Sequence, residues 1–350
     1  MARRRITIAT IAEQAGLSVP TVSKVLNGRT DVSPDTRARV EVLLREAGYQ
    51  RRRSASAAPV PMIDLVFHEL GSPWSMEIIR GAEAAARDED VEIVLSEIGG
   101  AHQPRQEWID SVLTRRPAGV IMVFSDLAAD QRAQLDSRGI PYVVVDPIGD
   151  ESDDVPSVGS SNFSGGRMAT KHLTDLGHTR IGAISGPMDL LTSRARLAGY
   201  TDALRLQRLP PDPDLIREGD FFVDGGYAGG RALLELAEPP TAIFAGSDLQ
   251  ALGVYRAVLE RGLRIPEDMS VVGYDDLPLA SWIYPALTTV VQPMFEMAYH
   301  AAQLVLGLAR GSTPIARKVD LAVELRVRES TLRVDAPVPA ERVDDAHPPD

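Results

Sequence analysis

The sequence predicts an α/β protein, with a short all-helical N-terminal segment followed by a two-lobed domain that is built on parallel sheets. Three short helices can be read in residues 1–50 from the spacing of apolar side chains. From Met62 onward, short apolar runs alternate with amphipathic helical stretches, which is typical of parallel sheets covered by helices on both faces. The more than 250 residues of this part are too many for one core of this kind, so we expect two similar lobes.

The N-terminal helices follow local start and stop signals. The first is expected to end at Gly16, and Ser18 should cap the second, because its side chain can accept a hydrogen bond from a free backbone N–H group. A third helix is expected to begin at Ser33. Two short helices joined by a tight turn match a helix-turn-helix, although a small helical bundle used for dimerisation has the same pattern. The inward positions of the second helix are Val22, Val25 and Leu26.

Charge is distributed unevenly along the chain. Residues 1–53 carry eleven basic and five acidic side chains, whereas the remainder has a net charge of −18 and the whole chain one of −12. A small basic module joined to an acidic body suggests a nucleic-acid contact at the N-terminal end. The outward positions of the second helix, which would meet base edges in the major groove, are Val19, Pro20, Thr21, Ser23 and Lys24.

The composition also limits the classes of function. The chain has no cysteine, which excludes disulfides and thiolate metal sites. No apolar signal-peptide segment follows the basic N-terminus, and no apolar run approaches the roughly 20 residues of a membrane-spanning helix. We therefore expect a cytoplasmic protein without a membrane partner. Phosphate-binding glycine loops, nucleophile elbows and clustered metal ligands are not found, so neither catalysis nor a cofactor is expected.

The segment Thr7–Tyr49, TIATIAEQAGLSVPTVSKVLNGRTDVSPDTRARVEVLLREAGY, closely resembles the headpiece of the LacI/GalR family of transcriptional regulators. The resemblance implies that Val19, Pro20 and Lys24 help to select the operator. The first two offer only apolar contact, which suits a thymine methyl group, and Lys24 is the clearest hydrogen-bonding base reader, best suited to guanine. The phosphate-contacting residues that the resemblance implies are Thr7, Ser18, Thr21, Ser23 and Asn27.

The junction at residues 51–61 departs from the family pattern. Family members carry a hinge helix there with a leucine that wedges into the minor groove, but here Ala57 is the nearest match. Pro59 and Pro61 also limit the length of any helix. Two interpretations stay open: Arg51, Arg52 and Arg53 contact phosphates or a narrow minor groove, or the segment is a flexible linker of Ser, Ala and Pro.

The resemblance extends to about residue 330 through SSNFSGGRMATKHLTDLGHTRIGAISGP, SRARLAGY, GSDLQALG and VVGYDDLPLASWIYPALTTVVQP. It implies a periplasmic-binding-protein-like domain over residues 62–334 with crossings between lobes near residues 160, 290 and 320. The N-lobe would comprise about 62–160 and 291–320, and the C-lobe about 161–290 and 321–334. Gly165 and Gly166 should start a closely packed helix. Residues 335–350 lack heptad leucines, so we expect a disordered tail and a homodimer.

Ligands of open α/β sheets bind beyond the carboxyl ends of the strands, which in a two-lobed protein face each other across a cleft. Aromatic candidates there could cover the face of a ring, while Asp and Arg could bond neighbouring hydroxyls, which favours a sugar. A purine is the competing ligand, but Leu190 and Ser75 stand where the purine-responsive branch has arginine and phenylalanine. The effector-binding residues implied by the resemblance are Trp74, Ser75, Ser125, Asp146, Thr192, Arg196, Phe221, Ser247, Asp248, Asp275 and Gln292.

Together these features predict a ligand-responsive, sequence-specific regulator: a repressor of carbohydrate-utilisation genes that a sugar releases from a palindromic operator in double-stranded DNA. The effector would shift the population between two lobe arrangements of a dimer. The alternatives are a nucleobase-responsive repressor, a transport-type solute-binding protein and a metabolic α/β enzyme. A transport protein predicts a signal peptide and no headpiece, and an enzyme predicts a catalytic constellation; the sequence meets neither expectation.

Overall fold

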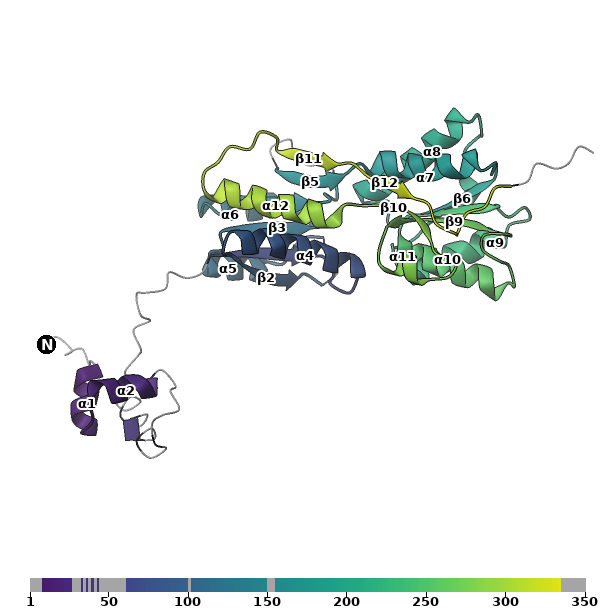
Figure 1. Ribbon diagram of the computed structural model, residues 1–350. Coiled ribbons are helices and arrows are strands. Elements are labelled where there is room, and N and C mark those ends of the chain that lie inside the picture. Colours follow the sequence, from purple (N-terminus) through teal and green to yellow (C-terminus); the bar gives the residue numbers. More distant parts are fainter. Residues whose placement is uncertain are drawn as a thin grey trace, which may run out of the picture. The chain divides into compact units, whose positions relative to one another are not determined.

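A computed structural model of the protein describes residues 8–26, 33, 36, 39–40, 43, 61–99, 102–149 and 155–334. The chain separates into two compact units, Met1–Val60 and Pro61–Asp350. The described part of the first unit contains helices, and the second unit contains both sheets (Figure 1).

The N-terminal unit packs α1 (Ile8–Ala15) and α2 (Val19–Leu26) around a small apolar core. Gly16 lies between them with a φ of +63°, a left-handed conformation that favours glycine, so α1 ends where the sequence predicted. Arg39, from the third helical stretch, donates a hydrogen bond of 2.8 Å to the carbonyl oxygen of Ala15. The buried residues of this core are Ile11, Ala12, Ala15, Val22, Val25 and Val40.

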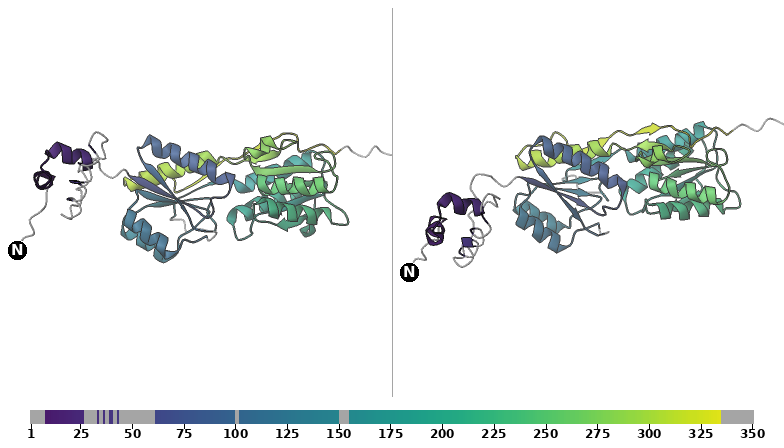
Figure 2. Two further views of the ribbon diagram at one scale, coloured as in Figure 1. Left: turned by 90° about the horizontal axis from the view of Figure 1, so that it is seen from below. Right: turned by 60° about the horizontal axis from the view of Figure 1, so that its bottom comes forward.

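The N-lobe of the second unit is a sheet of six parallel strands in the order β11-β5-β4-β3-β1-β2. The strands are β1 (Met62–Phe67), β2 (Glu92–Glu97), β3 (Gly119–Val123), β4 (Tyr142–Val145), β5 (Ser157–Ser160) and β11 (Lys318–Leu321). The helices are α4 (Pro73–Asp88), α5 (Gln106–Arg115), α6 (Ala129–Ser137) and α12 (Met294–Ala309). Helices α4 and α12 cover one face and α5 and α6 the other (Figures 1 and 2).

Alternation along β1 explains these two layers. Ile63, Leu65 and Phe67 pack under α4 and α12, whereas Val66 packs on the opposite face with α5 and α6. Asp64 is fully buried on that second face, where the guanidinium of Arg115 pairs with its carboxylate at 2.8 Å. Both faces of a parallel sheet are covered, so a buried charge on it requires such a partner.

The C-lobe sheet has the order β12-β10-β9-β8-β6-β7. Its strands are β6 (Ile181–Ser185), β7 (Ile216–Glu218), β8 (Ala242–Ala245), β9 (Ser270–Asp275), β10 (Thr288–Val291) and β12 (Glu324–Arg326). Its helices are α7 (Asn162–Asp175), α8 (Leu191–Leu206), η1 (Pro213–Leu215), α9 (Val223–Leu234), α10 (Asp248–Glu260) and α11 (Leu279–Trp282). Helices α7 and α8 cover one face, and α9 and α10 cover the other. Five strands are parallel, as expected, but β12 pairs antiparallel with β10.

Three segments carry the chain from one lobe to the other. The first follows β5 and leads into α7, the second follows β10 and leads into α12, and the third joins β11 to β12. Each lobe therefore contains pieces of chain that are distant in sequence, and the two sheets meet at a triple connection (Figure 1).

The helix expected to start at Gly165 and Gly166 begins earlier, at Asn162, so both glycines lie inside α7. They permit close packing, as predicted. A Cβ on Gly166 would lie 2.0 Å from the carbonyl oxygen of Arg196 on α8, and one on Gly165 would lie 2.3 Å from the hydroxyl oxygen of Tyr274. Contact this tight between two helices requires glycine at the crossing point.

Candidate functional site

Ser18 caps the N-terminal end of α2. Its hydroxyl accepts a hydrogen bond of 3.3 Å from the backbone N–H of Thr21 and lies 2.8 Å from the Thr21 hydroxyl. This confirms the predicted cap, which leaves the first turn of α2 ordered. The side chains of Val19, Pro20 and Lys24 are exposed, and Val19 keeps 46 % of its surface accessible.

The inner face of α2 is occupied by Val22 and Val25, which pack against Ile11 of α1. Among the described side chains of α2, the exposed ones are those of Val19, Pro20 and Lys24. The predicted DNA-contacting residues that lie outside the described part of the chain are Thr7, Asn27, Arg51, Arg52 and Arg53, and so does the side chain of Ser23.

A cavity of about 140 Å³ lies between the lobes, at the carboxyl ends of their strands. Its N-lobe wall comes from the segments that follow β1 and β3 and from the first turn of α4. Its C-lobe wall comes from α8, the segment before α9, and the ends of β8 and β9. The structure brings six of the eleven predicted effector residues to this cavity: Trp74, Ser75, Arg196, Phe221, Ser247 and Asp275.

Trp74 lies on the first turn of α4. Ser72 caps this helix, because its side chain accepts a hydrogen bond of 3.2 Å from the backbone N–H of Trp74. The indole tilts against the ring of Phe124, with 4.8 Å between ring centroids. The helix cap thus fixes the aromatic wall of the cavity.

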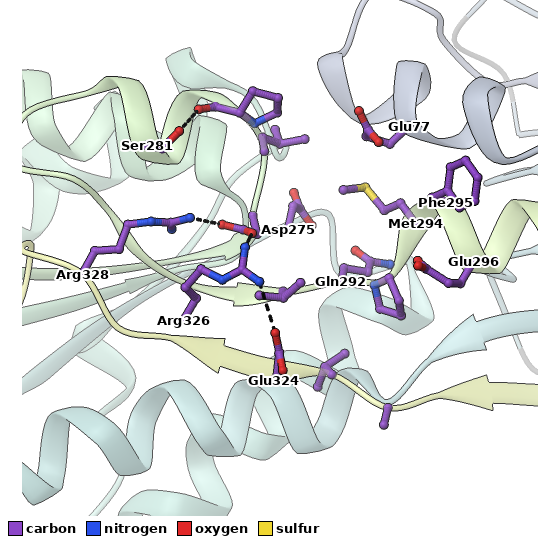
Figure 3. A pocket seen from close by; sticks show the side chains of 17 residues that line it. Glu77, Asp275, Ser281, Gln292, Met294, Phe295, Glu296, Glu324, Arg326 and Arg328 are labelled. Atoms are coloured by element: carbon purple, nitrogen blue, oxygen red, sulfur yellow. Dashed lines mark hydrogen bonds and ion pairs between the residues drawn. The ribbon is translucent and has the colours of Figure 1, made fainter.

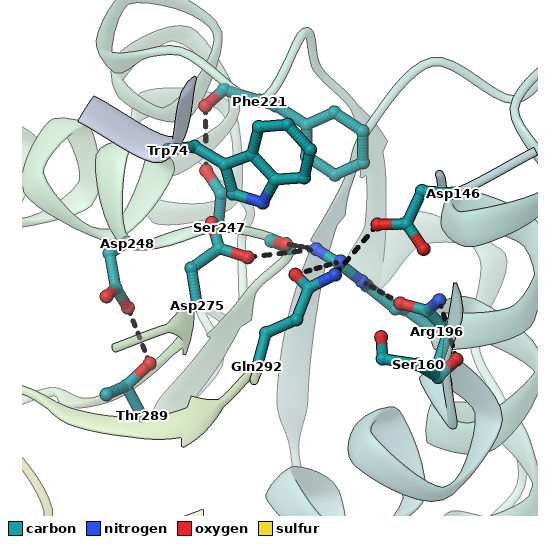
Figure 4. A network of polar contacts seen from close by, with 12 residues as sticks. Trp74, Asp146, Ser160, Arg196, Phe221, Ser247, Asp248, Asp275, Thr289 and Gln292 are labelled. Atoms are coloured by element: carbon teal, nitrogen blue, oxygen red, sulfur yellow. Dashed lines mark hydrogen bonds and ion pairs between the residues drawn. The ribbon is translucent and has the colours of Figure 1, made fainter. Parts of the chain in front are cut away.

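Arg196, on α8, is the centre of the polar network beneath the cavity (Figure 4). Its Nε donates to Asn162 Oδ1 at 2.8 Å, Nη1 donates to the Gly246 carbonyl oxygen at 2.6 Å, and Nη2 donates to Gln292 Oε1 at 3.1 Å. The guanidinium carbon lies 3.6 Å from the ring centroid of Tyr274. The group is 4 % exposed, and these contacts offset the cost of burying its charge.

Gln292 joins the lobes directly. Its Nε2 donates a hydrogen bond of 2.8 Å to Asp146 Oδ2 at the end of β4, while its Oε1 accepts from Arg196. Neither Asp146 nor Gln292 lines the 140 Å³ cavity. Asp146 and Thr192 instead line a second cavity of about 360 Å³ near the start of α7. The amide of Gln292 therefore lies between the N-lobe carboxylate and the C-lobe guanidinium.

Two of the predicted effector residues are engaged within the protein. Asp248 is fully buried, and its carboxylate accepts from the Thr289 hydroxyl at 2.5 Å and from the backbone N–H of Leu277 at 2.7 Å. The hydroxyl of Ser125 is also buried and donates to the Val123 carbonyl oxygen at 3.0 Å. The structure does not bring either residue to the cavity wall.

Burial dominates the electrostatics of the network. It raises the pKa of Asp146 to about 6 and that of Asp275 to about 7, against the attraction of Arg196, which lowers both. Asp275 Oδ1 lies 3.7 Å from Arg196 Nη1, which is too long for a hydrogen bond, and this oxygen has no hydrogen-bond partner among the described residues. Burial, with the charge of Asp275, also raises the pKa of Asp248 well above its usual range.

Strained backbone gathers at the same strand ends. Phe124, Asp146, Phe221 and Asp275 have φ values of 47°, 50°, 70° and 113°, which non-glycine residues rarely adopt. Such conformations cost on the order of 1–3 kcal/mol each and persist where the surrounding structure holds them. At Phe221 the ring lies against Gly186, where a Cβ would come within 2.1 Å of the ring. These side chains are held in position before any ligand arrives.

Sequence reasoning missed several residues of the cavity wall. His68 and Phe124 are the first residues after β1 and β3, so the position directly after each buried strand would have identified them. His102 lies in a loop, and no local pattern marks it. The further residues of the wall that the sequence analysis did not single out include Glu69, Pro187, Asp220 and Phe222.

A larger cavity, of about 670 Å³, lies at the lobe connections, where Asp275 and Gln292 also contribute to the wall (Figure 3). Its charged groups are largely paired with one another. Asp276 bonds Arg328 at 2.6 Å and also pairs with Arg326, which reaches Glu324 at 3.2 Å.

Two further properties concern only the residues that the structure describes. None of their helices combines the length and the apolar composition needed to cross a lipid bilayer. Within the same ranges, no three His, Cys, Asp or Glu side chains gather in a way that could hold a metal ion.

Comparison with known proteins agrees with both units. Residues 7–52 match the model of bacterial regulatory proteins of the lacI family, and residues 170–331 match a periplasmic binding protein-like domain. The transcriptional regulator CelR of Thermobifida fusca is 35 % identical over 94 % of this chain and 99 % of its own length. The repressor CytR of Escherichia coli K12 is 32 % identical over 94 % and 98 %.

Solved structures show the same likeness. A complex of CelR with cellobiose has a TM-score of 0.71 at 33 % identity and covers 93 % of this chain and all of that one. A lac repressor dimer bound to operator and to the anti-inducer ONPF has a TM-score of 0.69 at 29 % identity and covers 94 % of this chain and all of that one. The chain belongs to the LacI family of bacterial regulatory proteins and is a DNA-binding transcriptional regulator.

Proposed function

We propose that the protein is a homodimeric repressor that binds a palindromic operator through α2 and is released when a sugar occupies the cavity between its lobes. The observation that carries the proposal is the convergence of Trp74, Phe221, Arg196 and Asp275 on one interlobe cavity. Aromatic faces can cover the apolar side of a sugar ring, and the charged groups can bond its hydroxyls.

The wall of this cavity also favours a sugar over a nucleobase. Leu190 is buried in the cavity wall and offers a purine no hydrogen bond. The relative CelR, whose structure with cellobiose resembles this chain, supports a carbohydrate effector. The relatives CytR and PurR are repressors by name and support repression as the mode of regulation. Catalysis is not part of the proposal.

In the DNA complex, Val19 and Pro20 contact thymine methyl groups and Lys24 bonds guanine. Ser18, Thr21, Ser23, Thr7 and Asn27 hold phosphates, and Arg51–Arg53 contact the backbone or the minor groove near the operator centre. The exposure of Val19, Pro20 and Lys24 on α2 supports this orientation. A protein that acts on operator DNA works in the cytoplasm.

The effector acts by population shift. Because Gln292 bonds Asp146 of one lobe and Arg196 of the other, a ligand that contacts Arg196 competes with or reinforces a contact between the lobes. The ligand then favours one lobe arrangement only to the extent that it binds that arrangement more tightly. The headpieces of the dimer change their spacing, and two half-sites can no longer be held together.

The test is operator binding with and without sugar. Fluorescence anisotropy would follow the full-length protein on a palindrome from upstream of its own gene, first alone and then with cellobiose, glucose or ribose. We expect nanomolar binding of the palindrome, on the order of 10³-fold or more tighter than a scrambled duplex, and release by one of the sugars. Equal affinity for both duplexes would refute sequence-specific regulation, and tighter operator binding with sugar would refute the sign.

A further inference from the structure

A stacked pair of histidines forms part of the N-lobe wall of the effector cavity. His68 directly follows β1, and His102 lies in the loop before α5. Their rings are 4.4 Å apart between centroids and only 12° from parallel. Both residues line the cavity together with Trp74 and Phe124. Each ring restricts the motion of the other, so the polar atoms of the pair are presented in fixed positions.

The contacts of His102 determine which of its nitrogens carries a proton. Its Nδ1 lies 3.1 Å from the carbonyl oxygen of Phe124. A carbonyl oxygen can only accept, so Nδ1 carries the hydrogen and the Nε2 of the neutral ring carries the lone pair. Phe124 is itself held in a left-handed conformation and packs on Trp74. The ring of His102 is therefore anchored to the wall through Nδ1, and Nε2 is its acceptor for a ligand.

The charges on the wall restrict the ligand further. The carboxylates of Glu69, Asp220 and Asp275 line the cavity against the single guanidinium of Arg196. Each nitrogen of Arg196 already donates a hydrogen bond within the protein, and the group lies beside Asp275. A phosphate or carboxylate on the ligand would meet two like charges, those of Glu69 and Asp220, beside the Asp275 carboxyl group and a cation that is already compensated, which disfavours it.

We propose that the effector is an uncharged sugar, one of whose hydroxyls donates a hydrogen bond to Nε2 of His102, while the stacked ring of His68 holds His102 in place. This inference rests on the proposed function and narrows its ligand class. The sugar contacts His102 in the N-lobe and Arg196 and Asp275 in the C-lobe, so the bound sugar bridges the two lobes. Sugar phosphates and uronic acids are rejected.

The first experiment uses the wild-type full chain. Isothermal titration calorimetry with cellobiose, glucose, ribose, glucose 6-phosphate and glucuronate would compare neutral with anionic ligands. We expect at least one neutral sugar to bind and each anion to bind at least tenfold more weakly than glucose or not at all. Tighter binding of glucose 6-phosphate than of glucose overturns the ligand class. Binding of none of the five overturns the sugar effector itself, which is a failure of the proposed function.

The second experiment separates the hydrogen bond from the stacking. His102→Phe keeps a flat ring against His68 but removes the acceptor, and we expect it to bind the best neutral sugar about 3- to 10-fold more weakly, the worth of one net hydrogen bond. His102→Gln restores an amide oxygen and should recover part of the loss. His300→Phe, an exposed histidine on α12 outside this cavity, is the matched control and should bind as the wild type does.

The two His102 variants make the outcome decisive even if one of them folds poorly. Urea unfolding reports whether each variant keeps its fold, since His102 lies in the sugar-binding unit and α2 lies in the other. Unchanged sugar affinity in a folded His102→Phe protein overturns the role of Nε2. A loss in His102→Gln as large as in His102→Phe, with both proteins folded, also overturns it, because the restored acceptor would then contribute nothing.

Discussion

At the scale of single residues, Arg196 connects several segments of the site at once. Its guanidinium holds Asn162, the Gly246 carbonyl and Gln292, and it lies over Tyr274. A planar group with five donors can satisfy these directions at once, which an ammonium group cannot. The residue therefore organises both the C-lobe and the connection to the N-lobe.

Replacement of Arg196 by lysine should lower the stability of the protein, although it keeps the positive charge. We expect a loss of about 2–3 kcal/mol in the free energy of unfolding, because at least two buried acceptors lose their donor. Urea unfolding measures it. Arg194→Lys is the control, since Arg194 is an exposed residue on the same helix whose hydrogen bonds go to the carbonyl oxygens of Met188 and Asp189. Equal losses in the two variants would contradict this account.

Asp146 makes a pH-dependent contribution. Burial raises its folded-state pKa to about 6, above its ordinary value of roughly 3.9. The protonated form is thus favoured by folding, so its contribution is fully present below pH 4 and is lost as the pH rises through about 6. Asp146→Asn should remove this trend and leave an acceptor for Gln292. Between pH 5 and 7.5 the wild type should lose about 1.4 kcal/mol more than the variant.

Urea unfolding of both proteins at the two pH values gives the difference directly. Comparison with the variant removes the contribution of Asp248, whereas Asp275 adds to the difference, because the charge of Asp146 raises the pKa of Asp275 in the wild type alone. A wild type that gains stability relative to the variant as the pH rises would show the opposite sign and refute the assignment.

At the scale of elements, the crossing of α7 and α8 depends on glycine. A Cβ on Gly166 would lie 2.0 Å from the carbonyl oxygen of Arg196, so Gly166→Ala must push α8 away or distort α7. We expect a loss of about 1–3 kcal/mol in stability, with weaker sugar binding because Arg196 moves. Thermal unfolding and calorimetric titration measure the two effects.

Gly307→Ala is the matched control for this prediction. Gly307 lies in α12, and its added Cβ would have Ser312 Cβ at 3.9 Å as its nearest contact. This substitution should raise stability by about 0.5–1 kcal/mol, since alanine loses less conformational entropy in a helix. If Gly166→Ala were as stable as Gly307→Ala, the crossing of α7 and α8 would accommodate a Cβ at position 166, which would contradict this prediction.

A second element-scale feature is the C-terminal segment 330–334, which packs on the C-lobe through His178. The imidazole is within 3.1 Å of the Ser270 hydroxyl and the Leu332 carbonyl oxygen and 2.9 Å from the Thr241 hydroxyl. Burial lowers the pKa of His178. Its contribution to stability is therefore present above about pH 6.5 and is lost as the pH falls toward the folded-state pKa.

His178→Gln should make stability less sensitive to acid. From pH 7.5 to 5.5 the wild type should lose more of its free energy of unfolding than the variant, because glutamine cannot take up a proton. His172→Gln, close by on α7, tests whether the trend belongs to His178, since the pKa of His172 is also lowered by burial. Parallel pH profiles for wild type and His178→Gln would contradict the assignment.

At the scale of the whole molecule, sugar and operator must influence each other equally. If a sugar weakens operator binding by a given factor, operator DNA must weaken sugar binding by the same factor, about 5- to 150-fold for ordinary coupling. Titration of sugar into protein alone and into the operator complex measures this. If sugar released the operator but saturating operator left sugar affinity unchanged, the titrated sugar site could not be the site that releases the operator.

The helix-turn-helix and the α/β class follow from the sequence. These features depend on local signals: a cap at Ser18, a turn at Gly16, and apolar runs of strand length. The antiparallel strand β12 has only three residues, Glu324–Arg326, too few for a periodic pattern. Its direction is set by the third lobe connection, which brings it back beside β10.

The site, too, contains residues that the sequence identifies and contacts that only the tertiary structure shows. Arg196 and Asp275 could be named from the sequence, because a strand end and a family motif mark them. Only the tertiary structure decided that Asp248 is bonded by Thr289 and Leu277 inside the C-lobe, and that His68 and His102, 34 positions apart in the sequence, stack in the N-lobe wall. Side-chain identity is local, but burial, partners and pKa depend on which distant segments the three lobe connections bring together.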